Sequence, residues 1–427
     1  MRKNSLWRLS AFLAIVAMLI AACGGTATPT AAPPAETEAP EAMPPTEAPP
    51  PTAVPPLEFT FGMLLVGPAN DHGWSQAHFE AGLYVEQQIP GTSKIYLENV
   101  YSGSPAYPGT TTSQLAEQLV QQGSRLIIFN SDDMKDEATK FAQDHPDVPV
   151  IMASGDQLWE EGKAYVPMAN MVNIMGRMEY GKMIAGCAAA LTSQTGKIGY
   201  LGPLINDETR RLASSAYLGA SHCWEAAGKD PAALSFKVTW IGFWFNIPGV
   251  TSDPTQVADD FFNSGYDVVI SGIDTTEGLT EAKRLHDAGK AVWAIPYDFK
   301  GACDQAPEIC LGVPYFNWGP AYKTTLQSAI DGTFASNFQW NGPDWSDINN
   351  PDTSAVGFVI GPALSAEATT SLNDFIADLA GGLNLWTGPI NLQDGTVYLT
   401  DGQVATDQQV WYLPQLLQGM EGQSASQ

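Results

Sequence analysis

The chain has 427 residues, of which 44% are hydrophobic and 10% aromatic, so it can build substantial cores and is not a wholly disordered protein. Its 46 acidic residues outnumber its 20 Lys and Arg residues, which gives a formal charge of −26. Because nucleic acid and anionic lipid headgroups are both bound through cations, this composition argues against nucleic acid as a partner and against adsorption to anionic lipid.

Residues 1–23 have the pattern of a secretory signal. Arg2, Lys3 and Arg8 precede an apolar run that ends in the sequence IAAC at Cys23. The run is shorter than the roughly 20 residues that a membrane-spanning helix needs. Its ending resembles a bacterial lipobox, which predicts that Cys23 is acylated and becomes the mature N-terminus. Cleavage of an ordinary signal peptide nearby is the alternative.

The next segment, residues 24–56, holds 11 prolines and four glutamates but neither Lys nor Arg. Such a segment cannot bury apolar surface, and we expect an extended, disordered tether. A lipid at Cys23 and a spacer behind it predict a folded domain that is anchored to the bacterial cell membrane on its extracytoplasmic side.

Four further cysteines are compatible with export. Cys303 and Cys310 are close enough in sequence for a loop-closing disulfide, and Cys187 and Cys223 could pair across neighbouring helices. Zinc is the competing interpretation of four cysteines, but their spacing is irregular and contains no C-x-x-C pair. Disulfides or buried free thiols are therefore expected, and no metal site.

From Leu57 onward, short apolar runs alternate with stretches of helical periodicity, as in parallel α/β sheets. The first set of predicted strands is 59–66, 94–100, 125–130 and 149–154, with helices at 78–88, 112–122 and 135–144. A small-residue helix at 175–192 follows. The second set of strands is 197–201, 237–241, 267–271 and 291–295, with helices at 213–227, 254–264 and 280–288. Two such sets predict two doubly wound lobes, with a ligand cleft at the carboxyl ends of their strands.

Motifs for catalysis are weak. Residues 176–182 match G-x-x-x-x-G-K, but Met183 stands where Mg²⁺ binding requires Ser or Thr, and the match lies inside a predicted helix. No G-x-G-x-x-G, G-x-S-x-G or H-E-x-x-H motif is present. Of the five histidines, only His72 falls in a loop expected to line the cleft. We expect neither an enzyme nor a cofactor.

Several segments in order resemble the basic membrane protein (BMP) family, the purine nucleoside receptor-like substrate-binding lipoproteins of ABC transporters. They are DHGWSQAHFEAG (71–82), YLENVYSG (96–103), HPDVPVIMASG (145–155), GKMIAGCAAALTSQTGKIGYLG (181–202), WIGFWFNIPG (240–249), SGYDVVISGIDTT (264–276), YFNWGPAY (315–322) and GPINLQDGTVYL (388–399). The first loop carries Gly73-Trp74 in place of the D-x-S-F-N signature of the nucleoside-receptor branch, which puts that branch's ribose contacts in doubt.

The resemblance implies a type I periplasmic-binding-protein fold, with two parallel-sheet lobes joined by a three-crossover hinge. Lobe one would comprise residues 57–170 plus 299–336, and lobe two residues 171–298 plus 337–427. Ligand capture would occur by hinge closure. The implied partners are a small-molecule ligand and the permease and ATPase subunits of an ABC importer, and we expect a monomer.

Aromatic candidates for the ligand site follow two strands. Asn70, Asp71 and Trp74 lie after the first strand, where Trp74 offers a flat face and Asp71 can accept hydrogen bonds. Capping of the next helix is the alternative role of Asp71. Trp244, with Phe243, follows the strand at 237–241 and matches the family's stacking aromatic. Packing between the lobes is the alternative there.

Polar candidates stand at other strand ends. Asp274 and Asp298 each end an apolar run, and Ser131, Asp132 and Asp156 occupy equivalent positions. A carboxylate at the carboxyl end of a parallel strand can point into the cleft. Capping of the following helix or turn is the alternative for each of them.

Asn317 and Trp318 match the family's return segment, where they either contact ligand or pack the hinge. The candidates together provide aromatic faces and acceptor oxygens with few cations, which suits a neutral, planar, N–H-rich molecule such as a purine base or nucleoside. A nucleotide would require Arg or Lys for its phosphates. The alternatives to a transport receptor are a surface ligand-sensing or antigen-like lipoprotein and, with less support, a nucleoside hydrolase.

Overall fold

The computed structural model describes residues 57–425. The predicted signal, the lipobox cysteine Cys23 and the predicted tether at 24–56 lie outside the described residues, as do residues 426–427. Within 57–425, no helix is both long and apolar enough to cross a membrane.

The first lobe is built on a six-stranded sheet in the order β11-β5-β4-β3-β1-β2, with every neighbouring pair parallel. Its strands are β1 (Phe59–Leu64), β2 (Thr92–Leu97), β3 (Ile127–Phe129), β4 (Val150–Ala153), β5 (Met171–Gly176) and β11 (Asn337–Asn341). Its helices are α1 (Trp74–Gln88), α2 (Thr112–Gln121), α3 (Lys135–Asp144), α8 (Gly319–Ile330) and the single 3₁₀ turn η1 (Asp132–Met134). The central strands β3 and β4 are wholly buried because helices cover both faces of a parallel sheet.

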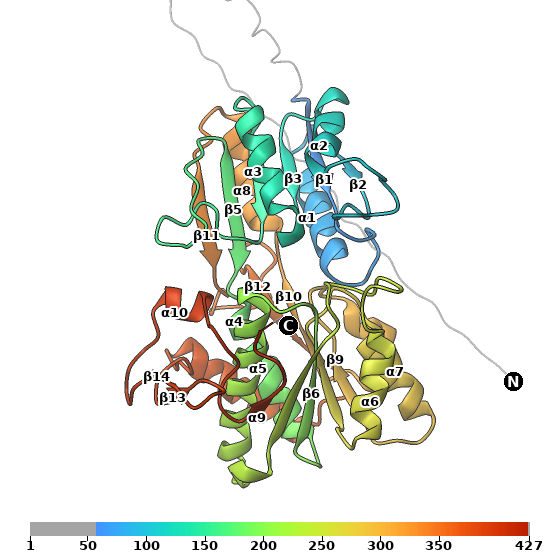
Figure 1. Ribbon diagram of the computed structural model, residues 1–427, viewed down its shortest axis with the longest axis vertical. Helices are drawn as coiled ribbons and strands as arrows, with labels where there is room; N and C mark the ends of the chain where they lie inside the picture. The colour runs from blue at the N-terminus through green and yellow to red at the C-terminus, as the bar shows by residue number, and fades with distance from the viewer. Residues whose placement is uncertain (1–56, 426–427) are drawn as a thin grey trace, which may run out of the picture. The chain divides into compact units, whose positions relative to one another are not determined.

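The second lobe has a parallel sheet in the order β15-β7-β6-β8-β9. Its strands are β6 (Lys197–Gly202), β7 (Ser235–Trp240), β8 (Val268–Ser271), β9 (Trp293–Ile295) and β15 (Met420–Glu421). Its helices are α4 (Met178–Thr192), α5 (Asp207–Ala226), α6 (Pro254–Asn263), α7 (Glu277–Asp287) and α9 (Ala366–Ala380), with 3₁₀ turns η2 (Pro231–Ala233) and η3 (Ala302–Gln305). Separate apolar cores lie on the α4–α5–α9 side and on the α6–α7 side. The two doubly wound lobes predicted from the sequence are therefore confirmed (Figure 1).

Three passages of the chain connect the lobes. The first crossing follows β5, the second runs through β10 (Gly312–Phe316), and the third runs from β11 to β12 (Val356–Ile360). Strands β10 and β12 pair antiparallel and run between the two sheets (Figure 1). The predicted lobe boundaries fall after residues 170 and 336, whereas β5 and β11 still belong to the first sheet, so the first and third crossings come later in the chain than those boundaries.

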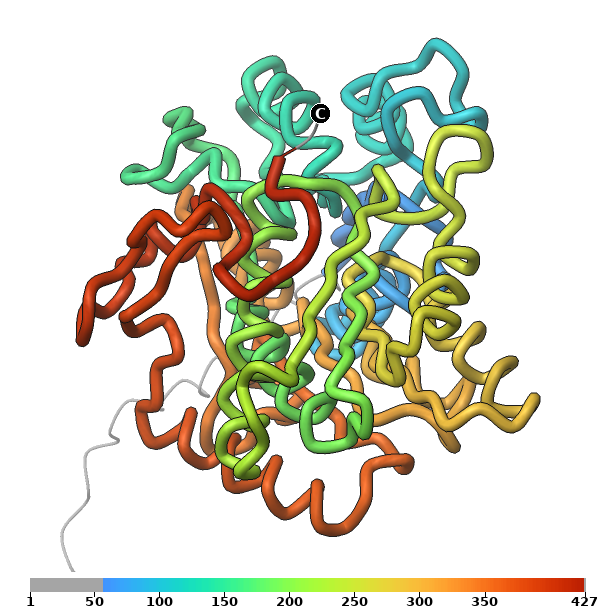
Figure 2. Tube along the Cα trace, turned by 60° about the horizontal axis from the view of Figure 1, so that its bottom comes forward, coloured from blue at the N-terminus to red at the C-terminus, as the bar shows by residue number. Residues whose placement is uncertain are grey.

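The structure differs from the predicted elements in three places. Strand β5 occupies part of the helix predicted at 175–192, because all six of its residues are buried between two neighbouring strands. Helix α5 begins at Asp207 and not at residue 213 as predicted, because Asn206 and Thr209 form a capping box at this earlier start. The C-terminal region, for which no elements were predicted, contains the hairpin β13 (Ile390–Asn391) and β14 (Val397–Leu399) and the short helix α10 (Asp407–Trp411), and it returns to pair β15 with β7 (Figure 2).

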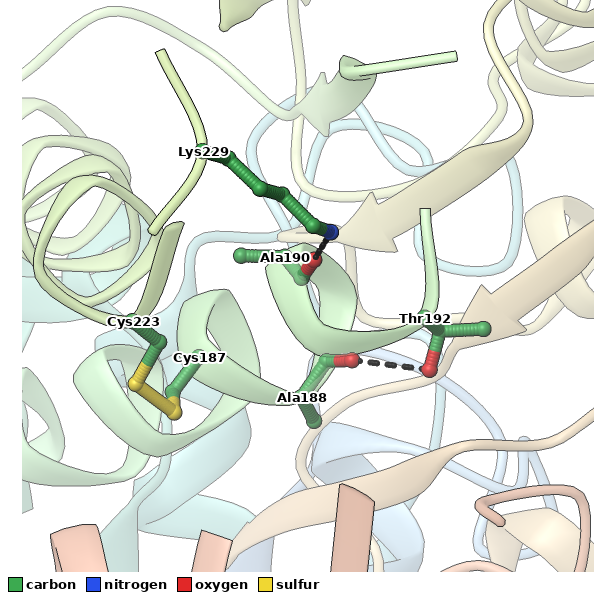
Figure 3. The surroundings of a disulfide bond; sticks show 6 residues. All are labelled: Cys187, Ala188, Ala190, Thr192, Cys223 and Lys229. Atoms are coloured by element: carbon green, nitrogen blue, oxygen red, sulfur yellow. Dashed lines mark hydrogen bonds between the residues drawn. A yellow bond between two sulfur atoms is a disulfide. The ribbon is translucent and has the colours of Figure 1, made fainter. Parts of the chain in front are cut away.

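Both proposed cysteine pairs form disulfides. The bond from Cys187 to Cys223 joins α4 to α5, with Cα atoms 5.1 Å apart, and lies beside the end of α4 where the Lys229 ammonium donates to the Ala190 carbonyl (Figure 3). The bond from Cys303 to Cys310 closes a short loop, with Cα atoms 5.5 Å apart.

Removing the two disulfides is expected to have unequal effects on stability. The Cys187–Cys223 bond closes a loop over 36 residues, and the Cys303–Cys310 bond closes one over 7. By loop-closure entropy, alanine pairs should lower the free energy of unfolding by about 4 kcal/mol for the first bond and about 2 kcal/mol for the second. Urea unfolding of the two double variants measures both values, and an equal or reversed order would contradict the prediction.

Candidate ligand-binding site

A narrow cavity lies between the lobes, at the carboxyl ends of the parallel strands of both sheets. The first lobe contributes Trp74, Ser131, Asp132 and Ser154, and the second contributes Tyr200, Glu208, Thr209, Leu212, Trp244, Gly272, Asp274 and Tyr297. Six of these twelve residues come within three positions after a strand, which is where ligands bind in doubly wound α/β folds. Five predicted residues, Trp74, Ser131, Asp132, Trp244 and Asp274, are among them.

Trp74 forms a wall of the cavity and is held firmly from behind. Its indole N–H donates to the Asn130 carbonyl at the end of β3, and its ring packs edge-on against Phe316 and Trp318, with centroids 5.3 Å away in each case. Because the hydrogen bond to Asn130 and the packing against Phe316 and Trp318 hold two sides of the indole, its ring has a fixed orientation. This wall is therefore preorganised for a flat ligand.

Trp244 and Asp274 form part of the opposite wall. The Asp274 N–H donates to the Trp244 carbonyl at 2.9 Å, and the Asp274 carbonyl accepts from the Trp74 N–H at 3.3 Å. The second of these bonds crosses from one lobe to the other. Gly73 makes it possible, because a Cβ at this position would lie 1.7 Å from the Asp274 carbonyl oxygen. The lobes thus touch through backbone atoms, which defines a closed arrangement.

Two predicted residues before α1 lie outside the cavity lining. Asn70 is exposed. The Asp71 carboxylate accepts from the N–H groups of Gly73, Ser75 and Gln76 at 2.9–3.0 Å, so it stabilises the start of α1. Burial raises the pKa of Asp71 to about 6, although these three donors act in the opposite direction. The capping alternative considered for Asp71 matches this geometry.

Asp156 and Phe243 contact other parts of the protein. The Tyr412 hydroxyl donates to the Asp156 carboxylate, which lines a second, polar cavity beside the first. Phe243 packs against Tyr101 of the other lobe, with ring centroids 5.7 Å apart. Packing between the lobes, the alternative considered for these aromatics, therefore describes Phe243, whereas its neighbour Trp244 lines the cavity.

Asp298 is fully buried behind the cavity. Neither of its carboxylate oxygens has a hydrogen-bond partner among the described residues, and its backbone has φ of 71°. Burial raises its pKa well above the ordinary value, while the nearby Lys182 ammonium acts to lower it. Lys182 is itself fully buried, donates to the Ser271 carbonyl at 2.7 Å and lies 3.1 Å from the centre of the Tyr297 ring. Burial lowers the pKa of Lys182.

Asn317 and Trp318 make contacts within the hinge region and do not line the cavity. The Asn317 side-chain amide donates to the carbonyls of Pro351 and Ser354, which precede β12. Trp318 stacks on the buried His78 ring at 4.4 Å and on Phe316 at 4.8 Å. The predicted cleft histidine, His72, is exposed.

Seven cavity residues were not predicted: Ser154, Tyr200, Glu208, Thr209, Leu212, Gly272 and Tyr297. Ser154, Gly272 and Tyr297 do stand at predicted strand ends, so the rule that selected Ser131 at such a position could have selected them too. Glu208, Thr209 and Leu212 escaped because α5 was predicted to begin after them. Lys182 is the lysine of the G-x-x-x-x-G-K match at residues 176–182, for which the sequence analysis rejected a phosphate-binding role.

The lining carries three carboxyl groups and no cationic side chain. Burial raises the pKa of Asp274 well above its ordinary value and that of Glu208 to about 7, so both acids are harder to ionise than in water. Among the described residues, no cluster of three His, Cys, Asp or Glu side chains is arranged to hold a metal ion. The cavity offers acceptor oxygens, hydroxyl groups and aromatic faces to a ligand.

Comparison with known proteins confirms the resemblance to the family. Residues 59–229 match the family model Bmp, described as ABC transporter substrate-binding protein PnrA-like. A purine-binding protein of Brucella abortus is 28% identical over 349 residues, which are 81% of this chain and 88% of that protein. A putative ABC transporter glucose-binding protein of Haloferax volcanii is 26% identical over 282 residues, covering 65% of this chain and 62% of that protein.

The solved structures support the fold. An ABC transporter solute-binding protein from Aeropyrum pernix K1 superposes with a TM-score of 0.60 at 12% identity, over 78% of this chain and 93% of that chain. Identity at this level speaks for the fold alone. Together with the two parallel-sheet lobes, it confirms the type I periplasmic-binding-protein fold.

Proposed function

With the match to the Bmp family as the premise, we propose that this protein is the extracytoplasmic receptor of an ABC importer and that it binds a purine base or nucleoside between its lobes. The observation that carries the ligand class is the cavity lining, in which two tryptophans accompany three carboxyl groups and no cation. Flat apolar faces favour a planar ring, and carboxylate acceptors favour a ring that carries N–H groups.

Other ligand classes fit this lining less well. A nucleotide would bring phosphates, which need Arg, Lys or helix N-termini, and an amino acid would bring a carboxylate into a cavity that already holds three acids. A sugar presents several hydroxyl groups that both donate and accept, and the lining offers side-chain donors only from a few hydroxyl groups and the Trp244 indole. The name of the Brucella relative supports a purine, and that of the Haloferax relative makes glucose the natural competitor.

We further propose that this receptor is held at the membrane surface, where it delivers solute to a permease. The signal-like residues 1–23 and the proline-rich segment support a lipid at Cys23 and a tether that holds the receptor at the membrane surface. Closure of the lobes around solute would create the form that the permease recognises. This role requires binding and release without turnover.

Calorimetric titration tests the ligand class directly. The panel comprises adenine, guanine, xanthine, adenosine, guanosine, inosine and glucose, each added to protein that has been unfolded and refolded to remove retained ligand. We expect saturable binding of at least one purine at a stoichiometry of one, with glucose silent. Silence across all six purines, or binding of glucose alone, would reject the proposal. Chromatography of the mixtures should recover the purine unchanged.

A further inference from the structure

Glu208 stands where the two interlobe cavities meet. It lines the cavity with the tryptophans and also the adjoining polar cavity, which holds Lys135, Asp156 and Arg211 in its walls. The residue lies in the first turn of α5, and that turn is fixed by the capping box between Asn206 and Thr209. A side chain on a capped helix start is held at a defined place, as recognition of a ligand requires.

One oxygen of Glu208 is already engaged by the opposite lobe. The Ser154 hydroxyl donates to Oε2 at 3.2 Å, and Ser154 has φ of 78°, an uncommon value for a residue with a Cβ. The described residues provide no hydrogen bond to Oε1 and no ion pair to this carboxyl. Oε1 is therefore the acceptor left for a ligand in the closed arrangement.

The charged surroundings of Glu208 are mostly acidic or committed elsewhere. The groups that influence it are Asp132 from the first lobe, Glu179 and Lys182 on α4, Arg211 on α5, and Asp274 and Asp298 after β8 and β9. Arg211 pairs with Glu179 and stacks over the Trp411 ring at 4.1 Å. Lys182 is bonded to the Ser271 carbonyl. Lys135, in the wall of the polar cavity, pairs with Asp132 at 3.2 Å. Among the described residues, none of these three cations forms an ion pair with Glu208.

We propose that Glu208 recognises the ligand by accepting a hydrogen bond from an amino group on the purine ring, so that the site selects amino-purines over oxo-purines. This inference rests on the proposed function. An oxo group in the same place would turn a lone pair toward the carboxylate and leave both acceptors without a donor, which is costly in a buried site.

Binding through an ionised carboxylate couples affinity to pH. Burial raises the pKa of Glu208 to about 7. A donor on the ligand stabilises the ionised form, so binding displaces the proton below this pKa. Affinity for an amino-purine should therefore increase with pH up to about 7, by at most tenfold per pH unit, and level off above it.

Adenine and hypoxanthine make the sharpest test, because they differ by an amino group against an oxo group at one ring position. Wild-type protein at pH 8 is expected to bind adenine about tenfold tighter or more, which is what a hydrogen bond to a charged group provides. Glu208→Gln should reduce this ratio to about threefold or reverse it, because the Gln amide can donate to the oxo group. It should also abolish the rise of adenine affinity between pH 5.5 and 8.

Asp207→Asn is the matched control. Asp207 lies in the same helical turn as Glu208 and pairs with Arg210, but it does not line the cavity that contains Trp74 and Trp244. The Asp207→Asn variant should therefore keep the wild-type ratio of adenine affinity to hypoxanthine affinity. Equal binding of the two purines by wild-type protein, or an equal loss of both in Glu208→Gln, would overturn the role of Glu208 while leaving a purine receptor in place. Failure of every purine to bind would overturn both proposals.

Discussion

Replacing Gly73 with alanine is expected to prevent the closed arrangement of the lobes and to weaken ligand binding about 100-fold. The built Cβ would lie 1.7 Å from the Asp274 carbonyl oxygen and 2.6 Å from its carbonyl carbon. These are backbone atoms of the opposite lobe, which cannot move aside as a side chain can. The Trp74 N–H would lose its bond to the same carbonyl.

The size of this effect follows from the population of the closed form. If the collision raises the free energy of closure by about 2.7 kcal/mol, only about one molecule in a hundred is competent to hold ligand, and the apparent Kd rises accordingly. Calorimetry with the tightest-binding purine measures the affinity. Small-angle scattering in saturating ligand should show a larger radius of gyration than that of wild type.

Gly278→Ala is the control for Gly73→Ala. Gly278 lies in α7, where a Cβ would meet its nearest neighbour, the side chain of Leu201, at an ordinary 3.4 Å. This variant should bind ligand as wild type does. Both variants should keep the wild-type unfolding midpoint, because Gly73 meets the other lobe and not a core. Wild-type affinity in Gly73→Ala would show that ligand binds without this backbone contact.

Replacing Trp244 with alanine is expected to weaken purine binding by roughly 5- to 150-fold. Stacking of a base on an aromatic side chain contributes about 1–3 kcal/mol, and the Trp244 ring is the large apolar face that the second lobe presents beside Asp274. Titration of adenine and adenosine into the variant measures the loss. The backbone bond from Asp274 to Trp244 is retained, so the carboxyl group stays in place.

Trp244→Phe separates stacking from packing. A phenyl ring keeps a flat face, so this variant should recover most of the affinity, with a loss below about fivefold. Phe243→Ala, which removes the neighbouring ring that packs on Tyr101, should change affinity less than Trp244→Ala. An alanine variant at Trp244 that binds purines as wild type does would exclude this ring from the site.

The sequence predicted the sheet strands well, because a buried parallel strand is a short apolar run whose signal is local. All eight predicted strands occur, as β1–β4 and β6–β9. Strand β5 was missed since its apolar residues merge with the small-residue helix α4 that follows. Strand β11 alternates polar and aromatic residues and the C-terminal β15 is only two residues long, so neither has a clear pattern of its own. Strand β12 is a short apolar run that the sequence analysis did not assign.

The candidate site was predicted in outline but not residue by residue. Asp274 and Asp298 follow strands in the same way, yet Asp274 lines the cavity and Asp298 is buried behind it, where its backbone N–H bonds to β10. Phe243 and Trp244 are neighbours in a bend after β7, yet Phe243 packs on Tyr101 of the other lobe and Trp244 lines the cavity. Such directions depend on the path of the backbone through the hinge.

By itself, the sequence determined the α/β class, the two lobes and the family resemblance, because these follow from local patterns and from ordered segments along the chain. It named the two possible cysteine pairs, and the structure decided that both form disulfides. The sequence also determined that the cavity lining would be poor in cations. Only the tertiary structure decided which strand-end side chains share a cavity, that Gly73 meets Asp274, and that Glu208 and Ser154 join across the lobes. These are contacts between residues 54 to 201 positions apart, and their geometry is set by the packing of two sheets against a common hinge.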